Sequence, residues 1–377
     1  MKRIILSRTD SIGDVVLTLP LAGVLKKYLP ETTVLFLGNS YTKPVVEAST
    51  FVDEFINWDP ISRMTYRDQV AAFRSLRADA IIHVFQVKEI TKLAKLSRIP
   101  LRVGTTHRLF TWFYCNRLIW FSRKNSSLHE AQLNLKLLKP LGIDVKLSRE
   151  EIPEYYGLEA PKSLFASLCS QGDLLPPPQG RAGEGSSSNL VIARIPSIRE
   201  TRQQHQASGI RHPASKFKLI LHPKSKGSAR EWGLENFSRL IELLPKNKYE
   251  VFITGTEAEG ELMREFLAKH RNAVTDMTGK MTLPEFMDFI RACDGLVAAS
   301  TGPLHIAAAF GKVAIGLYAP MRPIYPTRWA PLGEKATYLV LDKTCNDCRK
   351  NMDCHCMKEI RAEKVVEQLM TPPQPSP

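Results

Sequence analysis

The fold of this 377-residue chain is decided by the stretch Gly295-Leu-Val-Ala-Ala-Ser-Thr-Gly-Pro-Leu-His305, which continues as Ile306-Ala-Ala-Ala-Phe-Gly311. The pattern predicts a buried strand, a tight turn and the start of a helix. Small residues and a glycine at a strand end let the backbone approach a ligand, and the free N–H groups of the following helix then face an anion. Such a turn can hold a diphosphate without a metal. The alternative is an ordinary strand-to-helix turn of an α/β protein.

A second unit of the same kind lies near the N-terminus. The run Arg3-Ile-Ile-Leu-Ser7 predicts a buried strand, Arg8-Thr-Asp-Ser-Ile-Gly-Asp14 a polar turn, and the apolar-periodic residues 15–25 a helix. One such unit in each half predicts an α/β protein with two doubly wound, Rossmann-like domains whose strand ends face each other across a cleft. Asp14 is the carboxylate at the end of the first turn. We expect it to cap the helix beginning at Val15 and also to act as a general base.

Composition sets the expected domain boundaries. Strand-like runs alternate with polar helical runs through the first part, which predicts a parallel sheet closed by a helix from about Leu128 to Leu141 and stopped by Gly142. We expect a domain over 1–170, a Pro-, Gly-, Ser- and Gln-rich linker or insertion over 171–216, and a second domain over 217–342. Within the linker only Leu190–Ile195 could form a strand. A cysteine cluster and closing helix follow over 343–370, and a disordered tail over 371–377.

The second domain opens with a predicted strand, Phe217–His222, that leads into a basic, hydroxyl-rich loop. Lys224, Ser225 and Arg230 of this loop suit a diphosphate, although unremarkable solvated lysines are the alternative. The loop lacks the spacing of a P-loop. After the next predicted strand, Glu257 and Glu259 are both eligible to accept hydrogen bonds from ribose hydroxyls, or either merely favours a helix N-terminus.

Several motifs, in order along most of the chain, resemble those of the lipopolysaccharide heptosyltransferases, glycosyltransferase family 9. They are Ser11-Ile-Gly-Asp-Val15, Leu101-Arg-Val-Gly104, His129-Glu130, Leu221-His-Pro223 with Arg230-Glu-Trp-Gly233, and Thr301-Gly-Pro-Leu-His305. The resemblance implies a GT-B fold, an ADP-heptose donor, an inverting mechanism, and an acceptor in the inner core of lipopolysaccharide. It also implies a closing helix that packs back across the first domain. No Asp-x-Asp stands near the donor loop, which disfavours a metal-dependent GT-A enzyme.

The resemblance and the turn chemistry together assign roles to residues. We expect Asp14 to be catalytic and Ser11, Gly13 and Arg102 to bind the acceptor. The expected donor-binding residues are Lys224, Ser225, Arg230, Glu257, Glu259, Ser300, Thr301, Gly302, Pro303, Leu304 and His305. Ser300 departs from the best-studied family members, which carry Asp there, so another nucleotide-linked sugar stays open as the donor. A catalytically silent saccharide- or nucleotide-binding module is the other alternative, and retention of Asp14 argues against it.

The charge balance favours an acidic partner. The chain has 52 Lys and Arg against 38 Asp and Glu, a net charge of +14. An anionic membrane surface and a phosphorylated saccharide rank above nucleic acid, because no nucleic-acid-binding motif is present, and a merely solvated basic surface is the alternative. The N-terminal apolar stretch is too short for a signal peptide, and no apolar run approaches a membrane span, so we expect a cytoplasmic protein.

The aromatic segment Arg108–Arg117 could lie on the inner face of the inner membrane or dock a lipid-linked acceptor, and core packing is its alternative. The basic residues expected at the membrane are Arg108, Arg117, Arg123 and Lys124.

Of the seven cysteines, Cys115, Cys169 and Cys293 are scattered, and a cluster follows the second domain: Cys345, Cys348, Cys354 and Cys356. Inert structural thiols are the favoured interpretation, and no cofactor is expected. A structural zinc held by four thiolates, or by three with His355, is the alternative.

Overall fold

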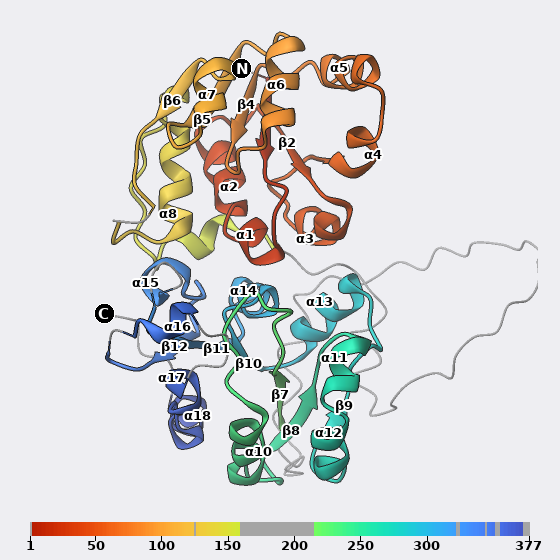
Figure 1. The fold of residues 1–377 in the computed structure, drawn as a ribbon, viewed down its shortest axis with the longest axis vertical. Helices are drawn as coiled ribbons and strands as arrows, with labels where there is room; N and C mark the ends of the chain where they lie inside the picture. The colour runs from red at the N-terminus through yellow and green to blue at the C-terminus, as the bar shows by residue number, and fades with distance from the viewer. Residues whose placement is uncertain are drawn as a thin grey trace, which may run out of the picture.

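The computed structural model describes residues 2–123, 126–158, 215–321, 325–343, 345–350 and 355–371. Within them, two six-stranded parallel sheets form two domains that stack one above the other (Figure 1). The fold class expected from the sequence is therefore confirmed. Several expectations fall outside the described residues: the strand at Leu190–Ile195, most of the linker and of the tail, and the residues Lys124, Cys169 and Cys354.

The first sheet has the strand order β3-β2-β1-β4-β5-β6. Its strands are β1 (Arg3–Ser7), β2 (Thr33–Gly38), β3 (Glu54–Asn57), β4 (Ala80–His83), β5 (Leu101–Thr105) and β6 (Arg117–Ile119). Its α-helices are α1 (Ile12–Val16), α2 (Leu19–Tyr28), α3 (Lys43–Glu47), α4 (Trp58–Ser62), α5 (Tyr66–Ser75), α6 (Lys88–Leu96), α7 (Leu109–Tyr114) and α8 (Glu130–Leu135). Short 3₁₀ helices span Ser40–Thr42, Lys136–Leu141 and Ile152–Tyr155.

The second sheet has the order β12-β11-β10-β7-β8-β9, which is the order of the first sheet counted from its own first strand, β7. Its strands are β7 (Phe217–His222), β8 (Tyr249–Ile253), β9 (Thr275–Asp276), β10 (Gly295–Ala299), β11 (Val313–Tyr318) and β12 (Ala336–Val340). Its helices are α10 (Leu234–Leu243), α11 (Glu257–Leu262), α12 (Arg264–His270), α13 (Leu283–Ala292), α14 (Gly302–Ala309), α15 (Pro326–Trp329), α16 (Asp347–Lys350), α17 (His355–Lys358) and α18 (Ala362–Met370).

Both faces of each sheet are buried, as the apolar strand sequences require. In β1, Ile4 and Leu6 pack on one face with α1, α2 and α8, while Ile5 packs on the other with α5 and α6. The second sheet divides in the same way, with α13 and α14 on one face and α10, α12 and α18 on the other. The cluster under α1 and α2 continues into that under α14, so one apolar core crosses the domain boundary.

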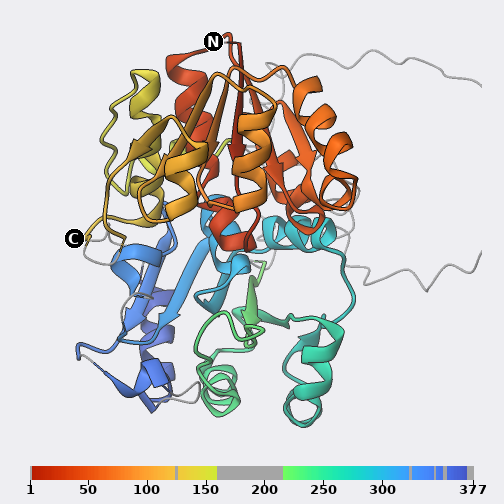
Figure 2. The ribbon, with the colours of Figure 1, turned by 45° about the horizontal axis from the view of Figure 1, so that its top comes forward.

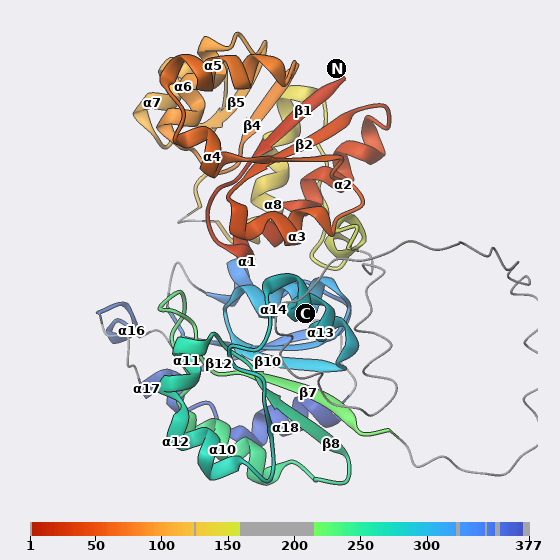
Figure 3. The ribbon, with the colours of Figure 1, turned by 90° about the vertical axis from the view of Figure 1, so that its right-hand side faces the viewer.

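The carboxyl ends of the strands point toward the domain boundary. In Figure 2, β1 runs from the N-terminus at the top down to α1, which lies against the second domain. Figure 3 shows α1 and α3 at the lower edge of the first domain, directly above α14 and α13. In both sheets the strand order reverses between the first and fourth strands, which is where α/β sheets bind ligands.

Three details differ from expectation. The helix α1 begins at Ile12, because Ser11 is already extended and takes the N-cap position, so Asp14 lies inside the first turn and is not the cap. The helix expected over 128–141 is α8 followed by a 3₁₀ helix, although it does end at Gly142, whose φ of 81° is left-handed. The closing helix α18 packs on α10 of the second domain, because its apolar face, with Val365, joins the cluster around Trp232.

Among the described residues, none of the helices is both long and apolar enough to pass through a bilayer.

Candidate functional site

The site is built where α1 of the first domain crosses α14 of the second. Each helix presents a glycine to the other. A Cβ on Gly13 would lie 2.9 Å from the His305 ring, and one on Gly302 would lie 2.8 Å from the Ile12 side chain. Backbone can approach this closely only where side chains are missing. The two glycines therefore bring the Asp14 turn and the α14 N-terminus together.

A cleft of about 570 Å³ opens beside this crossing, and both domains line it. The first domain contributes Ser11, Ile12, Ser40, Tyr41 and Pro44. The second contributes the α14 N-terminus, the loop after β7, the turn after β8 and an apolar wall from α13: His222, Ser225, Lys226, Ser228, Thr254, Gly255, Thr256, Glu259, Met277, Met281, Thr282, Leu283, Phe286, Thr301, Gly302, Pro303 and Ile306. Its volume suits a ligand of nucleotide size.

Asp14 lies beside the cleft, next to its lining residue Ser11, and is held there by a buried arginine. Its carboxylate accepts hydrogen bonds from Ser11 Oγ and from the guanidinium of Arg8. Arg8 also donates to both carboxylate oxygens of Asp10, at 2.7 and 3.0 Å. Burial opposes the charge of Arg8, but the carboxylates of Asp10, Asp14 and Glu130 outweigh it and raise the pKa of Arg8. Arg8 is therefore a permanent cation that fixes the Asp14 carboxylate.

Glu130 extends this charge network across the domain boundary. Its buried carboxylate pairs with Arg123 at 3.0 Å and, from the second domain, with Arg328 at 2.8 Å, while Arg8 lies 3.7 Å away. Burial raises its pKa, but the three arginines overcome that effect and the net pKa is lowered. A buried carboxylate is tolerated only with such partners. Glu130 thus ties the Asp14 cluster to α15.

The N-terminus of α14 offers anion-binding groups. Within the described residues, Thr301 Oγ1 is buried and lacks a hydrogen-bond partner, and Gly302 and Pro303 line the cleft beside it. Ser300 is instead hydrogen-bonded to the Tyr318 hydroxyl. A buried hydroxyl without a partner is costly, so Thr301 favours a ligand oxygen at this point.

Two residues expected at the donor lie deeper. Leu304 belongs to the apolar core. His305 is buried beneath Gly13, where desolvation lowers its pKa to about 4 despite the nearby Asp14 carboxylate. His305 is therefore neutral at physiological pH and supports the helix crossing.

The loop after β7 is structured by internal contacts. Lys224 pairs with Glu231 at 2.9 Å, and the Ser225 backbone N–H donates to the same carboxylate. Arg230 donates through Nε to the backbone oxygen of Cys348 at 2.9 Å. Neither Lys224 nor Arg230 lines the cleft, whereas Ser225, Lys226 and Ser228 do.

The sequence was also compared with those of known proteins. Residues 192–358 match the model of glycosyltransferase family 9 (heptosyltransferase). The match takes in most of the second domain, and over these residues the chain is heptosyltransferase-like.

Its relatives support that assignment. A putative glycosyltransferase of Haemophilus influenzae is 25% identical over 341 residues, 89% of this chain and 87% of the relative. Lipooligosaccharide heptosyltransferase 2 of the same organism is 34% identical over 119 residues, 30% of this chain and 34% of the relative. Among solved structures, E. coli ADP-heptose LPS heptosyltransferase II superimposes with a TM-score of 0.69 at 16% identity, over 98% of this chain and 97% of that one, and shows the same fold.

The cleft has an apolar end suited to a nucleobase. Met277, Met281 and Phe286 line it beside the turn after β8. Of the two expected glutamates, Glu259 lines the cleft and Glu257 is exposed on α11. One oxygen of Glu259 already accepts from the backbone N–H and the hydroxyl of Thr256, at 2.8 and 3.0 Å. Among the described residues, no hydrogen bond to its other oxygen is found.

The sequence analysis missed His222 and Thr254 as cleft residues of this heptosyltransferase-like protein. Desolvation lowers the pKa of His222 to about 4, its Nδ1 lies 3.0 Å from Thr254 Oγ1, and its ring stacks on Phe286. Both residues end a predicted strand, which was the available signal. Tyr41 and Ser40 carried no signal, because they reach the cleft through the packing of α3 on α1.

Arg102 is not brought to the cleft. Its guanidinium donates to the backbone oxygens of Ile99 and Tyr114, and so holds the chain around β5. Its expected acceptor role stays an untested prediction. The described cysteines of the C-terminal cluster, Cys345, Cys348 and Cys356, gather outside the cleft.

Proposed function

We propose that this family 9 chain transfers a heptose from ADP-heptose to the inner core of lipopolysaccharide, with inversion at the anomeric carbon. The observation that carries the proposal is the helix crossing, which sets the Asp14 turn and the N-terminus of α14 at one cleft. A base and an anion cradle at one site are the two groups that such a transfer requires. The relatives named as heptosyltransferases support the donor and the acceptor.

The donor fits the second-domain side of the cleft. We infer that the diphosphate lies at the N-terminus of α14, against Thr301 and Gly302, with Lys226 and Ser228 on its other side. The adenosine then reaches the apolar wall of Met277 and Phe286, and the free oxygen of Glu259 accepts from ribose. The heptose is left beside α1 and Asp14.

In the reaction, an acceptor hydroxyl oxygen attacks the anomeric carbon of the heptose from the face opposite the diphosphate. The bond between that carbon and the diphosphate oxygen breaks, ADP leaves with the electron pair, and the acceptor proton passes to Asp14. Arg8 keeps the Asp14 carboxylate in position. The N–H groups at the N-terminus of α14 and the Lys226 ammonium stabilise the negative charge that develops on ADP as it leaves.

The test is ADP release when ADP-heptose and deacylated inner-core acceptor are mixed with the protein, run beside a panel of other nucleotide-sugars. Turnover with ADP-heptose alone supports the proposal. Turnover with a different sugar nucleotide would make that nucleotide the donor. Ser300 leaves room for this outcome, because a hydroxyl stands there in place of a carboxylate. Saturable binding without turnover would establish the silent module instead.

We further propose that the enzyme meets its lipid-linked acceptor at the anionic surface of the inner membrane. Leu109 and Trp120 are 84% and 80% exposed, and Trp112 and Phe113 beside them are also exposed. The Trp112 indole donates to the Thr106 oxygen, and Trp120 follows the β6 residue paired with Thr105, so these side chains gather at one corner of the first domain.

Exposed aromatic residues beside cations are typical of interfacial anchors. Arg108 and Arg117 are exposed there, whereas Arg123, also expected at the membrane, pairs with Glu130. Vesicles with and without phosphatidylglycerol test the idea by co-sedimentation. Trp120→Ala should weaken binding several-fold, and Leu262→Ser, at an exposed leucine of the second domain, should not. Equal binding by both variants and the parent would refute the surface.

A further inference from the structure

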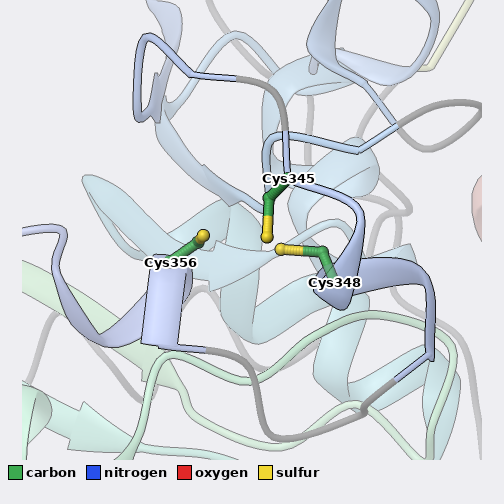
Figure 4. A group of neighbouring side chains, drawn as sticks. All are labelled: Cys345, Cys348 and Cys356. Carbon is green, nitrogen blue, oxygen red and sulfur yellow. The ribbon is translucent and has the colours of Figure 1, made fainter.

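Three cysteine sulfurs converge at the C-terminal edge of the second domain. Cys345 precedes α16, Cys348 lies in it, and Cys356 lies in α17. Their Sγ atoms all lie within 4.8 Å of one another, and Figure 4 shows the three side chains pointing toward a common centre. Thiolates about 2.3 Å from a tetrahedral zinc stand roughly 3.8 Å apart, so small side-chain rotations bring these sulfurs to ligand distance.

The helices of this segment are very short. Helices α16 and α17 have four residues each, far below the length at which a helix persists by itself. Of their described side chains, the buried ones are Cys348, Cys356 and Met357. Two of these three buried side chains carry thiols. A bound metal would supply folding free energy directly, as it does in small metal-bound domains.

The ammonium group of Lys343 lies beside the three cysteines and can offset the negative charge of their thiolates. Lys343 Nζ is hydrogen-bonded to Cys356, and it also pairs with Glu359 at 2.7 Å. Three thiolates around a divalent ion leave one net negative charge, which an adjacent ammonium offsets. A disulfide would use only two of the three sulfurs, whereas a metal uses all three.

We propose that Cys345, Cys348 and Cys356 bind a structural zinc ion. Sulfur-only ligation with tetrahedral spacing favours zinc over harder cations such as Mg²⁺ or Ca²⁺. The proposal assigns three ligands and leaves the fourth position open.

The zinc site fixes the loop that follows β7. The Cys348 backbone oxygen accepts from Arg230 at 2.9 Å, and the Cys345 backbone N–H donates to Pro320 at 3.2 Å, next to β11. The same loop carries Ser225 and Ser228 to the cleft. Loss of zinc is therefore expected to loosen the donor side of the cleft, a consequence that rests on the proposed function, while the zinc site itself does not.

The full-length protein, expressed in zinc-supplemented medium and purified without chelator, tests the site by metal analysis. We expect about one zinc per chain, and thiolate-to-metal charge-transfer absorption when cobalt replaces it. Chelation should lower Tm by roughly 5 °C or more, because the metal binds only the folded chain. None of these measurements needs donor or turnover.

Variants locate the ligands. Cys348→Ser and Cys356→Ser should lose the zinc and the cobalt spectrum, while Cys115→Ser, at a buried cysteine of the first domain, should keep both. If a ligand variant fails to fold, the cobalt spectrum and the chelator response of the parent still decide. A metal-free parent with reduced thiols, a disulfide found by mass spectrometry, zinc retained in Cys348→Ser, or iron in place of zinc would each overturn the proposal.

Discussion

The two domains share one strand order, yet the turns where that order reverses carry different residues. In the first domain the turn after its first strand carries Arg8, Asp10 and Asp14, and its charges satisfy one another. In the second domain the turn after its fourth strand, Ser300–Thr301, carries no charge and leaves a helix N-terminus and a buried hydroxyl at the cleft. Topology thus selects where a site forms, and the residues of each turn decide its chemistry.

The largest effect is expected for Asp14→Asn, which tests whether the first-domain turn supplies the base. The amide keeps the size of the side chain and its contacts with Ser11 but cannot take a proton, so kcat should fall by about 10²–10⁴ while ADP binding survives. Steady-state kinetics and calorimetric ADP titration measure the two effects.

Asp10→Asn is the matched control, because Asp10 shares Arg8 with Asp14. Its kcat should fall far less. An equal loss in both variants would assign the effect to the Arg8 charge cluster, and a near-parental rate for Asp14→Asn would remove the proposed base.

The next largest effect is expected at the crossing that joins the two turns. Gly13→Ala places a Cβ against the His305 ring and should push α1 from α14 by a few tenths of an ångström. We expect kcat to fall about 10-fold with little change in ADP affinity, because reacting groups are sensitive to small displacements. Combining it with His305→Ala should recover part of the loss. A penalty unchanged in the double variant would mean that the crossing is not its cause.

A smaller effect, on ADP affinity, tests the uncharged turn Ser300–Thr301. Thr301→Val removes the buried hydroxyl without changing the side-chain shape, so ADP should bind about five-fold more weakly while Tm stays level or rises. Thr105→Val removes another buried hydroxyl that has no partner among the described residues, but outside the cleft, and should leave ADP binding unaltered. Unchanged affinity in Thr301→Val would remove that hydroxyl from the donor site.

The last prediction concerns stability rather than activity, and its variable is pH. Burial lowers the pKa of His305 to about 4 in the folded chain, whereas its ordinary pKa, which applies to the unfolded chain, is 6.5. As pH falls from 6.5 to 4 the unfolded state binds the extra proton, so stability falls by up to about 1.4 kcal/mol per pH unit from this residue. His305→Gln should flatten the pH dependence of urea unfolding in this range. The same slope in parent and variant would contradict the assignment.

The sheets could be predicted from sequence because most of their strands are predominantly apolar runs. The expected bounds of β7 and β10, Phe217–His222 and Gly295–Ala299, are those of the structure. Turns were predictable as positions but not as contacts. Ser11 rather than Asp14 takes the N-cap position of α1, and Ser300 is hydrogen-bonded to Tyr318, a residue of the neighbouring strand.

Side-chain environment was the least predictable level. For the segment Arg108–Arg117 the sequence favoured core packing over a membrane surface, since it does not say whether another element covers α7. In the structure its Trp112 and Phe113 are exposed. The packing partner of α18 was unpredictable for the same reason, because it depends on which helix leaves an apolar face to cover. In the structure that helix is α10. His222 reached the cleft only through the assembly of β7 and β8.

The reciprocal fit of Gly13 with His305 and of Gly302 with Ile12 also bears on how such a protein can evolve. Each domain carries one half of a matched pair, so a domain borrowed from a relative brings a surface shaped for a different counterpart. A bulkier residue in one half can be accepted only after a smaller one has appeared in the other. The halves are thus inherited as a pair, and exchange of whole domains between lineages would be rarer here than the exchange of loops at the cleft rim.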